Sequence, residues 1–145
     1  TKISSKEFQD RLVAENINST KSNYFPNVYK PSEIQKIREV NLFSDGLCSA
    51  QDESGMIVTN LLEKVSPGDR ILDACVAPGG KYTALYEQYS GEGIIYGLET
   101  KYDRLKKVKE NCRRLGFSEN LLINGDANFP PFKEVFDQIM VDAPC

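Results

Sequence analysis

The second half of the chain alternates apolar runs with segments whose apolar residues recur every three or four positions. The runs predict strands over residues 70–75, 93–99, 121–124 and 136–142. Between the first two runs, four residues share one helical face: Tyr82, Leu85, Tyr86 and Tyr89. After the second run, a helix is expected from about Tyr102 to Leu115, closed by Gly116. Strands that alternate with helices of this length form a parallel sheet covered on both faces, so the pattern predicts a doubly wound α/β domain.

The first half of the chain has a weaker pattern. Ser4 and Glu7 have the spacing of a capping box, and apolar residues follow at helical intervals, so a helix is expected over about residues 5–16. Residues 18–33 mix polar residues with two prolines and predict irregular chain with one short strand around residues 28–30. Residues 34–40 suit either a helical turn or an edge of the same small layer. Ile57, Leu61, Leu62 and Val65 predict a further helix that ends at the turn 67–69.

Length and composition restrict the class of protein. The chain has 145 residues, of which 40% are hydrophobic and 27% charged, which suits one domain or a compact domain with an N-terminal appendage. The change from an irregular to a regular pattern near residues 41–51 divides the chain into residues 1–45 and residues 46–145. It has no run that spans a bilayer and no signal-peptide pattern, so a cytoplasmic protein without a membrane partner is expected. Four separated cysteines and the absence of histidine exclude a zinc site and a His-assisted nucleophile, so no metal is expected. The net charge of -3 argues against a generally basic surface for nucleic acids, although a local patch can exist.

The turn after the first predicted strand is the strongest candidate site. It consists of Cys75, Val76, Ala77, Pro78, Gly79, Gly80 and Lys81. A loop between a strand and a helix presents unpaired N–H groups that favour a carboxylate or a phosphate, and its two glycines let a ligand approach. Glu99 ends the second strand, 19 residues after Gly80, where it can accept hydrogen bonds from both ribose hydroxyls. The absence of GxGxxG disfavours a dinucleotide and therefore a nicotinamide-dependent oxidoreductase.

Further candidates follow the later strands. Asp126 comes after the third strand, where it could reach an adenine amino group or could only form a turn. Asp142 ends the fourth strand, next to the first, at the topological switch point where ligands bind. From the residues alone, Cys145 is well placed to act as a nucleophile. The cations of residues 101–114 could track phosphates or face solvent. Lys81 could place a positive charge beside the site or could be a solvated lysine in the first turn of the helix.

Five ordered motifs resemble those of the RNA (cytosine-5) methyltransferases of the Sun and nucleolar-protein group, and most of all the bacterial 16S ribosomal RNA enzymes. They lie at residues 46–54, 73–81, 107–116, 125–127 and 142–145. The sequence departs from the family pattern at Val76, at Tyr82 and at residues 97–99, where Glu99 replaces an aspartate and keeps an acceptor for the ribose.

The resemblance implies a Rossmann-like S-adenosylmethionine-dependent fold with strand order 3-2-1-4 over residues 46–145, and a small α/β segment over residues 1–45. It implies that residues 75–81, Glu99, Asp126 and Asp142 hold S-adenosylmethionine, and that Asp142 also lies near the polar edge of the base. The implied reaction methylates carbon 5 of cytosine in RNA, with ribosomal RNA as the expected partner, after a cysteine thiolate adds to carbon 6.

The family places that nucleophile in a Thr-Cys-Ser motif after the fifth strand, and this sequence lacks the motif. The resemblance gives Cys145 a role in releasing the product. The chain is therefore interpreted as a fragment that keeps the cofactor site but is inactive alone. The alternative is a non-catalytic RNA-binding or assembly module with a retained methyltransferase fold.

Overall fold

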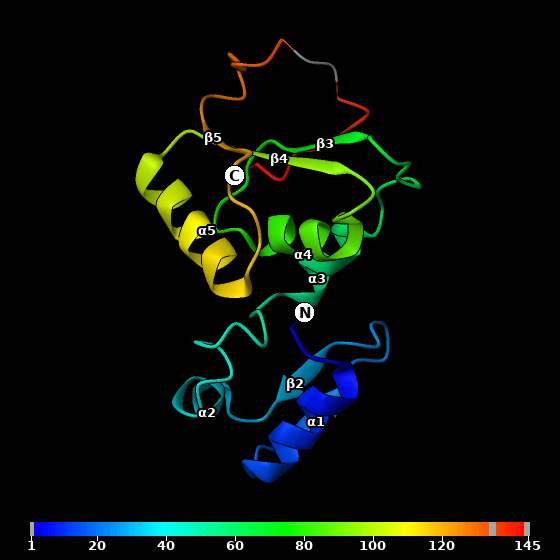
Figure 1. Ribbon diagram of the computed structural model, residues 1–145, viewed down its shortest axis with the longest axis vertical. Coiled ribbons are helices and arrows are strands. Elements are labelled where there is room, and N and C mark those ends of the chain that lie inside the picture. Colours follow the sequence, from blue (N-terminus) through cyan, green and yellow to red (C-terminus); the bar gives the residue numbers. More distant parts are fainter. Residues whose placement is uncertain (1, 134–135, 144–145) are drawn as a thin grey trace. The chain divides into compact units, whose positions relative to one another are not determined.

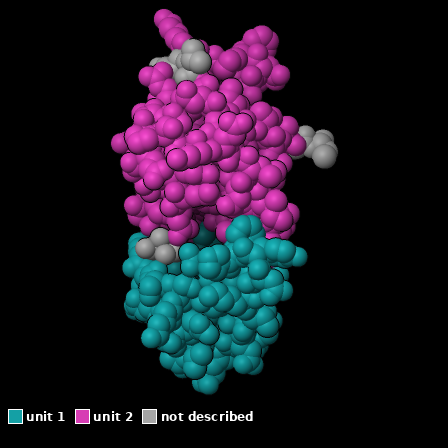
Figure 2. All heavy atoms as spheres, turned by 90° about the vertical axis from the view of Figure 1, so that its right-hand side faces the viewer, with its two compact units in different colours: residues 1–49 teal, residues 50–145 magenta. Residues whose placement is uncertain are grey.

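The computed structural model describes residues 2–133 and 136–143 of the chain. The chain divides into two compact units, residues 1–49 and residues 50–145, which Figure 2 shows in two colours. Each unit has an apolar core of its own, so each is described separately.

The first unit combines two helices with a two-stranded antiparallel sheet. Its elements are α1 (Ser5–Ala14), β1 (Ser19–Lys21), β2 (Tyr29–Pro31) and α2 (Ile34–Glu39). The hydroxyl of Ser4 accepts a hydrogen bond from the N–H of Glu7 at 3.1 Å, as the predicted capping box requires. The expectation of irregular chain is wrong at β1. The residues of this strand are polar and show no alternation of apolar and polar positions, and the strand is stabilised by its hydrogen bonds to β2.

The second unit contains a parallel four-stranded sheet and three helices. Its elements are α3 (Glu53–Thr59), β3 (Arg70–Asp73), α4 (Gly80–Tyr89), β4 (Ile94–Glu99), α5 (Tyr102–Leu115), β5 (Leu122–Asn124) and β6 (Gln138–Met140). The strand order is β5-β4-β3-β6, so the predicted order 3-2-1-4 is confirmed. The predicted helix from Tyr102 to Leu115 is also confirmed, and Gly116 ends it with a left-handed backbone.

The two faces of this sheet are covered differently. Helices α4 and α5 pack on one face, where Ile71, Leu85 and Val108 belong to the main core, and α3 packs on α4 (Figure 1). On the other face, the aromatic rings of Phe132 and Phe136 pack around Leu72 and Leu98 with other residues of the same face. The predicted α/β class with a parallel sheet is confirmed, and no helix of the described residues packs on that second face.

The predicted helix through Leu61 and Val65 is shorter than expected. It ends at Thr59, after which the side-chain amide of Asn60 donates to the carbonyl of Met56 at 2.8 Å. An asparagine amide that bonds to the preceding turn competes with continued helix, so the chain leaves the helix here. Leu61 is consequently 76% exposed. Val65 is buried, although it lies in the segment that follows the helix.

The start of α3 gives a first prediction. The carboxylate of Asp52 accepts a hydrogen bond from the N–H of Ser54 at 3.1 Å and caps the helix. Asp52→Ala should lower the free energy of unfolding by about 1 kcal/mol, the usual cost of a lost cap. Urea denaturation measures this change, and Asp52→Ser is the matched control because serine can still cap. Equal stabilities of the two variants would contradict the capping role.

Candidate functional site

The carboxyl ends of the parallel strands bring most of the predicted site residues to one edge of the second unit. Asp73, the last residue of β3, pairs in register with Gly97 of β4 and with Met140 of β6. Glu99 ends β4 two residues beyond Gly97, and Asp142 follows Met140 by two residues. The loop after β3 therefore leaves the sheet between two strand ends that each carry an acid.

The loop between β3 and α4 ends in two glycines with different surroundings. Gly79 has φ 102°, and no side chain caps the helix that begins after it. A Cβ at Gly79 would lie 3.1 Å from the side chain of Val108, whereas a Cβ at Gly80 would meet nothing within 4 Å. The first turn of α4 thus has N–H groups without a side-chain acceptor, and there is free space beside Gly80.

The other predicted residues of the loop present different groups. The side chain of Val76 is buried in the main core, and its N–H donates to the carbonyl of Leu98 at 2.9 Å, so neither group is available to a ligand. Pro78 is exposed, and the peptide bond between Ala77 and Pro78 is cis.

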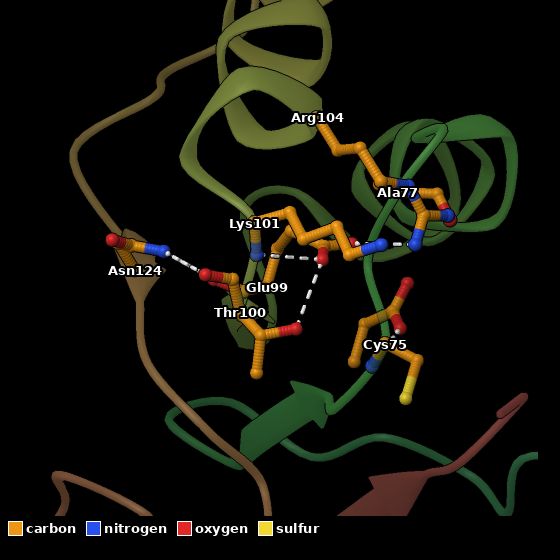
Figure 3. Close-up of polar contacts among 8 residues, drawn as sticks. Cys75, Ala77, Glu99, Thr100, Lys101, Arg104 and Asn124 are labelled. Atoms are coloured by element: carbon orange, nitrogen blue, oxygen red, sulfur yellow. Dashed lines mark hydrogen bonds and ion pairs between the residues drawn. The ribbon is translucent and has the colours of Figure 1, made fainter.

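Three groups of the chain itself hold the carboxylate of Glu99 (Figure 3). Its Oε1 accepts hydrogen bonds from the N–H of Lys101 at 2.9 Å and from the hydroxyl of Thr100 at 3.3 Å. Its Oε2 lies 3.5 Å from the Nη1 of Arg104, whose Nη2 donates to the carbonyl of Ala77 at 3.0 Å. A carboxylate can accept about four hydrogen bonds, so Glu99 keeps capacity for a further donor.

Arg104 is a residue of this edge that the sequence reasoning misses. That reasoning groups it with the other cations of its helix, which suit either phosphates or solvent. Its guanidinium instead links the loop to the acid of β4, because Arg104 lies on the flank of α5 beside the buried Leu105. An arginine in the first turn after a strand that ends in an acid is the signal that could have identified it.

Asp73 is the second residue that the sequence reasoning leaves out of the site. It is 1% exposed, and its Oδ1 accepts a hydrogen bond from the N–H of Cys75 at 3.2 Å. Burial raises the pKa of Asp73 to about 7; the bond from Cys75 and the charge of Lys81 lower it, while the charges of Asp142 and Glu99 raise it. The signal in the sequence for a buried carboxyl is an aspartate that belongs to an apolar strand rather than to the turn that follows it.

The cysteines of the second unit have separate environments. The interpretation of Cys112 as a core thiol is confirmed, since it is fully buried, but the same interpretation is wrong for the half-buried Cys75. Burial, followed by the charge of Asp73, raises the pKa of the Cys75 thiol, which is therefore neutral. Cys145 lies outside the described residues.

Two further predicted residues have defined partners. The Nζ of Lys81 lies 2.5 Å from Oδ2 of Asp142, so these side chains form an ion pair across the edge. Asp126 uses its Oδ1 to accept hydrogen bonds from the backbone N–H of Asn128 at 2.8 Å and from its side-chain amide at 2.9 Å. The contact to Asn128 is that of a turn-forming aspartate, which was the alternative to an adenine contact.

Among residues 2–133 and 136–143, no group of three or more His, Cys, Asp or Glu side chains is arranged to hold a metal ion. Within the same residues, no helix is both long and apolar enough to cross a membrane.

The parallel sheet, with helices that follow its strands and an acid at the end of β4, defines an α/β domain of the Rossmann-like class. A family model described as 16S rRNA methyltransferase RsmB/F matches residues 60–145. The chain therefore belongs to this family, and the resemblance stated from its motifs is confirmed.

Individual relatives agree with this assignment. The chain is 33% identical over 142 residues to the ribosomal RNA small subunit methyltransferase B of Vibrio vulnificus, covering 96% of this chain and 33% of that protein. It is 34% identical to the probable ribosomal RNA small subunit methyltransferase B of Bacillus subtilis, covering 96% and 31%. The chain thus spans about a third of the length of these two curated relatives.

Solved structures share the fold. A methyltransferase homolog protein from Pyrococcus horikoshii has a TM-score of 0.81 and 27% identity, covering 99% of this chain and 48% of that chain. NSun6 from the same organism, in a structure with SFG, has a TM-score of 0.69 and 31% identity, covering 83% and 30%. The predicted Rossmann-like methyltransferase fold is confirmed by these likenesses.

Proposed function

We propose that this chain binds S-adenosylmethionine at the carboxyl edge of its sheet, as part of an enzyme that methylates carbon 5 of cytosine in ribosomal RNA. The observation that carries the proposal is the uncapped start of α4 beside a strand that ends in the buried Glu99. The names of the relatives support methylation of ribosomal RNA, the family resemblance supports carbon 5 of cytosine as the position, and the free space at Gly80 supports the ligand.

The chemistry of the donor set fits this cofactor. The N–H groups at the start of α4 suit the carboxylate of its methionine part, because the helix dipole favours negative charge there. The remaining acceptor capacity of Glu99 suits the ribose hydroxyls. Because the bonds from Asn128 go to Oδ1 of Asp126, its Oδ2 is the oxygen that would accept a hydrogen bond from the adenine amino group. The cofactor supplies an electrophilic methyl group on a sulfonium sulfur.

The ion pair of Lys81 and Asp142 gives the base-binding side of the site its charge. The side chain of Asp142 is 55% exposed, so a carboxylate oxygen can accept a hydrogen bond from the polar edge of a cytosine. Lys81 holds Asp142 in place from the first turn of α4. We assign Cys145 the release of product, as the family resemblance implies. RNA as the partner and the cytoplasm as the location stay predictions.

Calorimetric titration tests the proposal. The chain, shown by circular dichroism to be folded, is titrated first with S-adenosylmethionine and then with NAD. We expect saturable binding of S-adenosylmethionine and none of NAD, since the loop lacks the glycine pattern that admits a pyrophosphate. A folded sample that binds neither ligand, or only NAD, would overturn the proposal.

A further inference from the structure

Within the part of the chain that the structure describes, the buried carboxyl of Asp73 forms no ion pair. Among the described residues, its polar partner is the N–H of Cys75, at 3.2 Å from Oδ1. The two cations of the edge are engaged elsewhere, Lys81 with Asp142 and Arg104 with Glu99. An ionised carboxylate in this position is costly, because burial removes water without supplying a full counter-charge.

One additional positive charge at this edge would be stabilised by the carboxylate of Asp73. Glu99 and Asp142 each form an ion pair, with Arg104 and Lys81, whereas no ion pair is recorded for Asp73 among the described residues, so ionisation of Asp73 adds one negative charge that no ion pair offsets. Burial raises the pKa of Asp73 to about 7, so both states are populated near neutral pH. A bound cation near this group therefore favours the ionised state.

The cofactor and its product differ by one charge at the sulfur. S-adenosylmethionine bears a sulfonium cation, whereas S-adenosylhomocysteine has a neutral thioether and the same amino and carboxylate groups. We propose that Asp73 is a charge-discriminating residue that is ionised beside the methyl donor and takes up a proton from solvent when the product replaces it. This inference rests on the proposed function. It needs no direct contact with the sulfur, since charges in a buried environment interact over several ångströms.

The alternative role of Asp73 is only to shape the loop through its bond to Cys75. Asp73→Asn separates the two roles, because the asparagine oxygen can still accept that hydrogen bond but cannot ionise. Asp137→Asn is the matched control. Asp137 also accepts a hydrogen bond from one backbone N–H, that of Arg70 at 2.7 Å. Arg70 is the first residue of β3, so Asp137 lies at the opposite end of that strand from Asp73.

Calorimetry in two buffers of different ionisation enthalpy, between pH 6 and pH 8, measures the protons released on binding. In the unmodified chain, S-adenosylmethionine should release a fraction of a proton and S-adenosylhomocysteine none. The affinity ratio of donor to product should rise with pH, by up to about tenfold per unit below pH 7, and then level off. In Asp73→Asn the ratio should fall and become independent of pH, whereas Asp137→Asn should behave like the unmodified chain.

The outcomes separate the two proposals. If both ligands bind with equal proton release in the unmodified chain, the charge-discriminating role of Asp73 is wrong while the cofactor assignment stands. The same conclusion follows if Asp73→Asn is folded and keeps the pH-dependent ratio. If the folded chain binds neither ligand, the proposed function fails and this inference fails with it.

Discussion

Replacing Glu99 with glutamine is expected to weaken the binding of S-adenosylmethionine by about 10- to 100-fold. A hydrogen bond to a charged group contributes about 1.5–3 kcal/mol, and 1.4 kcal/mol corresponds to a factor of ten. The side-chain oxygen of the glutamine can still accept the hydrogen bond from the N–H of Lys101. Its NH₂ group, however, would replace the negatively charged oxygen that now pairs with the guanidinium of Arg104. The variant should therefore fold and lose affinity for the ribose.

Calorimetric titration of the folded variant measures this loss. Glu92→Gln is the control, because Glu92 is an exposed glutamate in the turn before β4, far along that strand from the site. Affinity of Glu99→Gln equal to that of the unmodified chain would show that the acid of β4 does not hold the cofactor. Weakened binding in both variants would point to a general effect of charge.

The fold of the second unit could largely be predicted because its signals are local. The apolar residues Leu105, Val108, Cys112 and Leu115 recur on one face of α5, and Gly116 supplies the left-handed end, so pattern and termination agree. The short strand β1 could not be predicted in this way, since its polar residues gain their order from the register with β2. The side-chain bond that ends α3 at Asn60 likewise leaves no mark in the hydrophobic pattern.

The candidate site could be predicted only where a motif fixes the backbone. The two glycines and the strand-end acid follow from spacing along the chain, but Arg104 and Asp73 depend on distances between elements. Arg104 joins the site because α5 lies beside the loop, so that its guanidinium reaches the carbonyl of Ala77. The pKa of Asp73 depends on how completely the neighbouring strands bury it. Such effects require the three-dimensional arrangement.

The two adjacent glycines of the loop should respond to alanine in opposite ways. Gly79→Ala forces a side chain into φ 102° and brings its Cβ to 3.1 Å from Val108. Backbone strain of this kind costs of order 1–3 kcal/mol, and overpacking adds about 1–3 kcal/mol. Gly80→Ala meets no atom within 4 Å and lies in a helix, where alanine is favoured by up to about 1 kcal/mol. It should leave stability unchanged or slightly higher.

The same pair should separate folding from binding. Gly80→Ala places a methyl group in the free space assigned to the cofactor, so its affinity for S-adenosylmethionine should fall about tenfold or more, equivalent to about 1.4 kcal/mol. Gly91→Ala is the control for strain, since Gly91 has φ 101° and nothing within 4 Å of its Cβ position. Urea denaturation should therefore rank Gly79→Ala below Gly91→Ala, and both below Gly80→Ala. If Gly80→Ala instead unfolds the chain, or binds the cofactor normally, the free space beside this glycine serves the fold rather than the ligand.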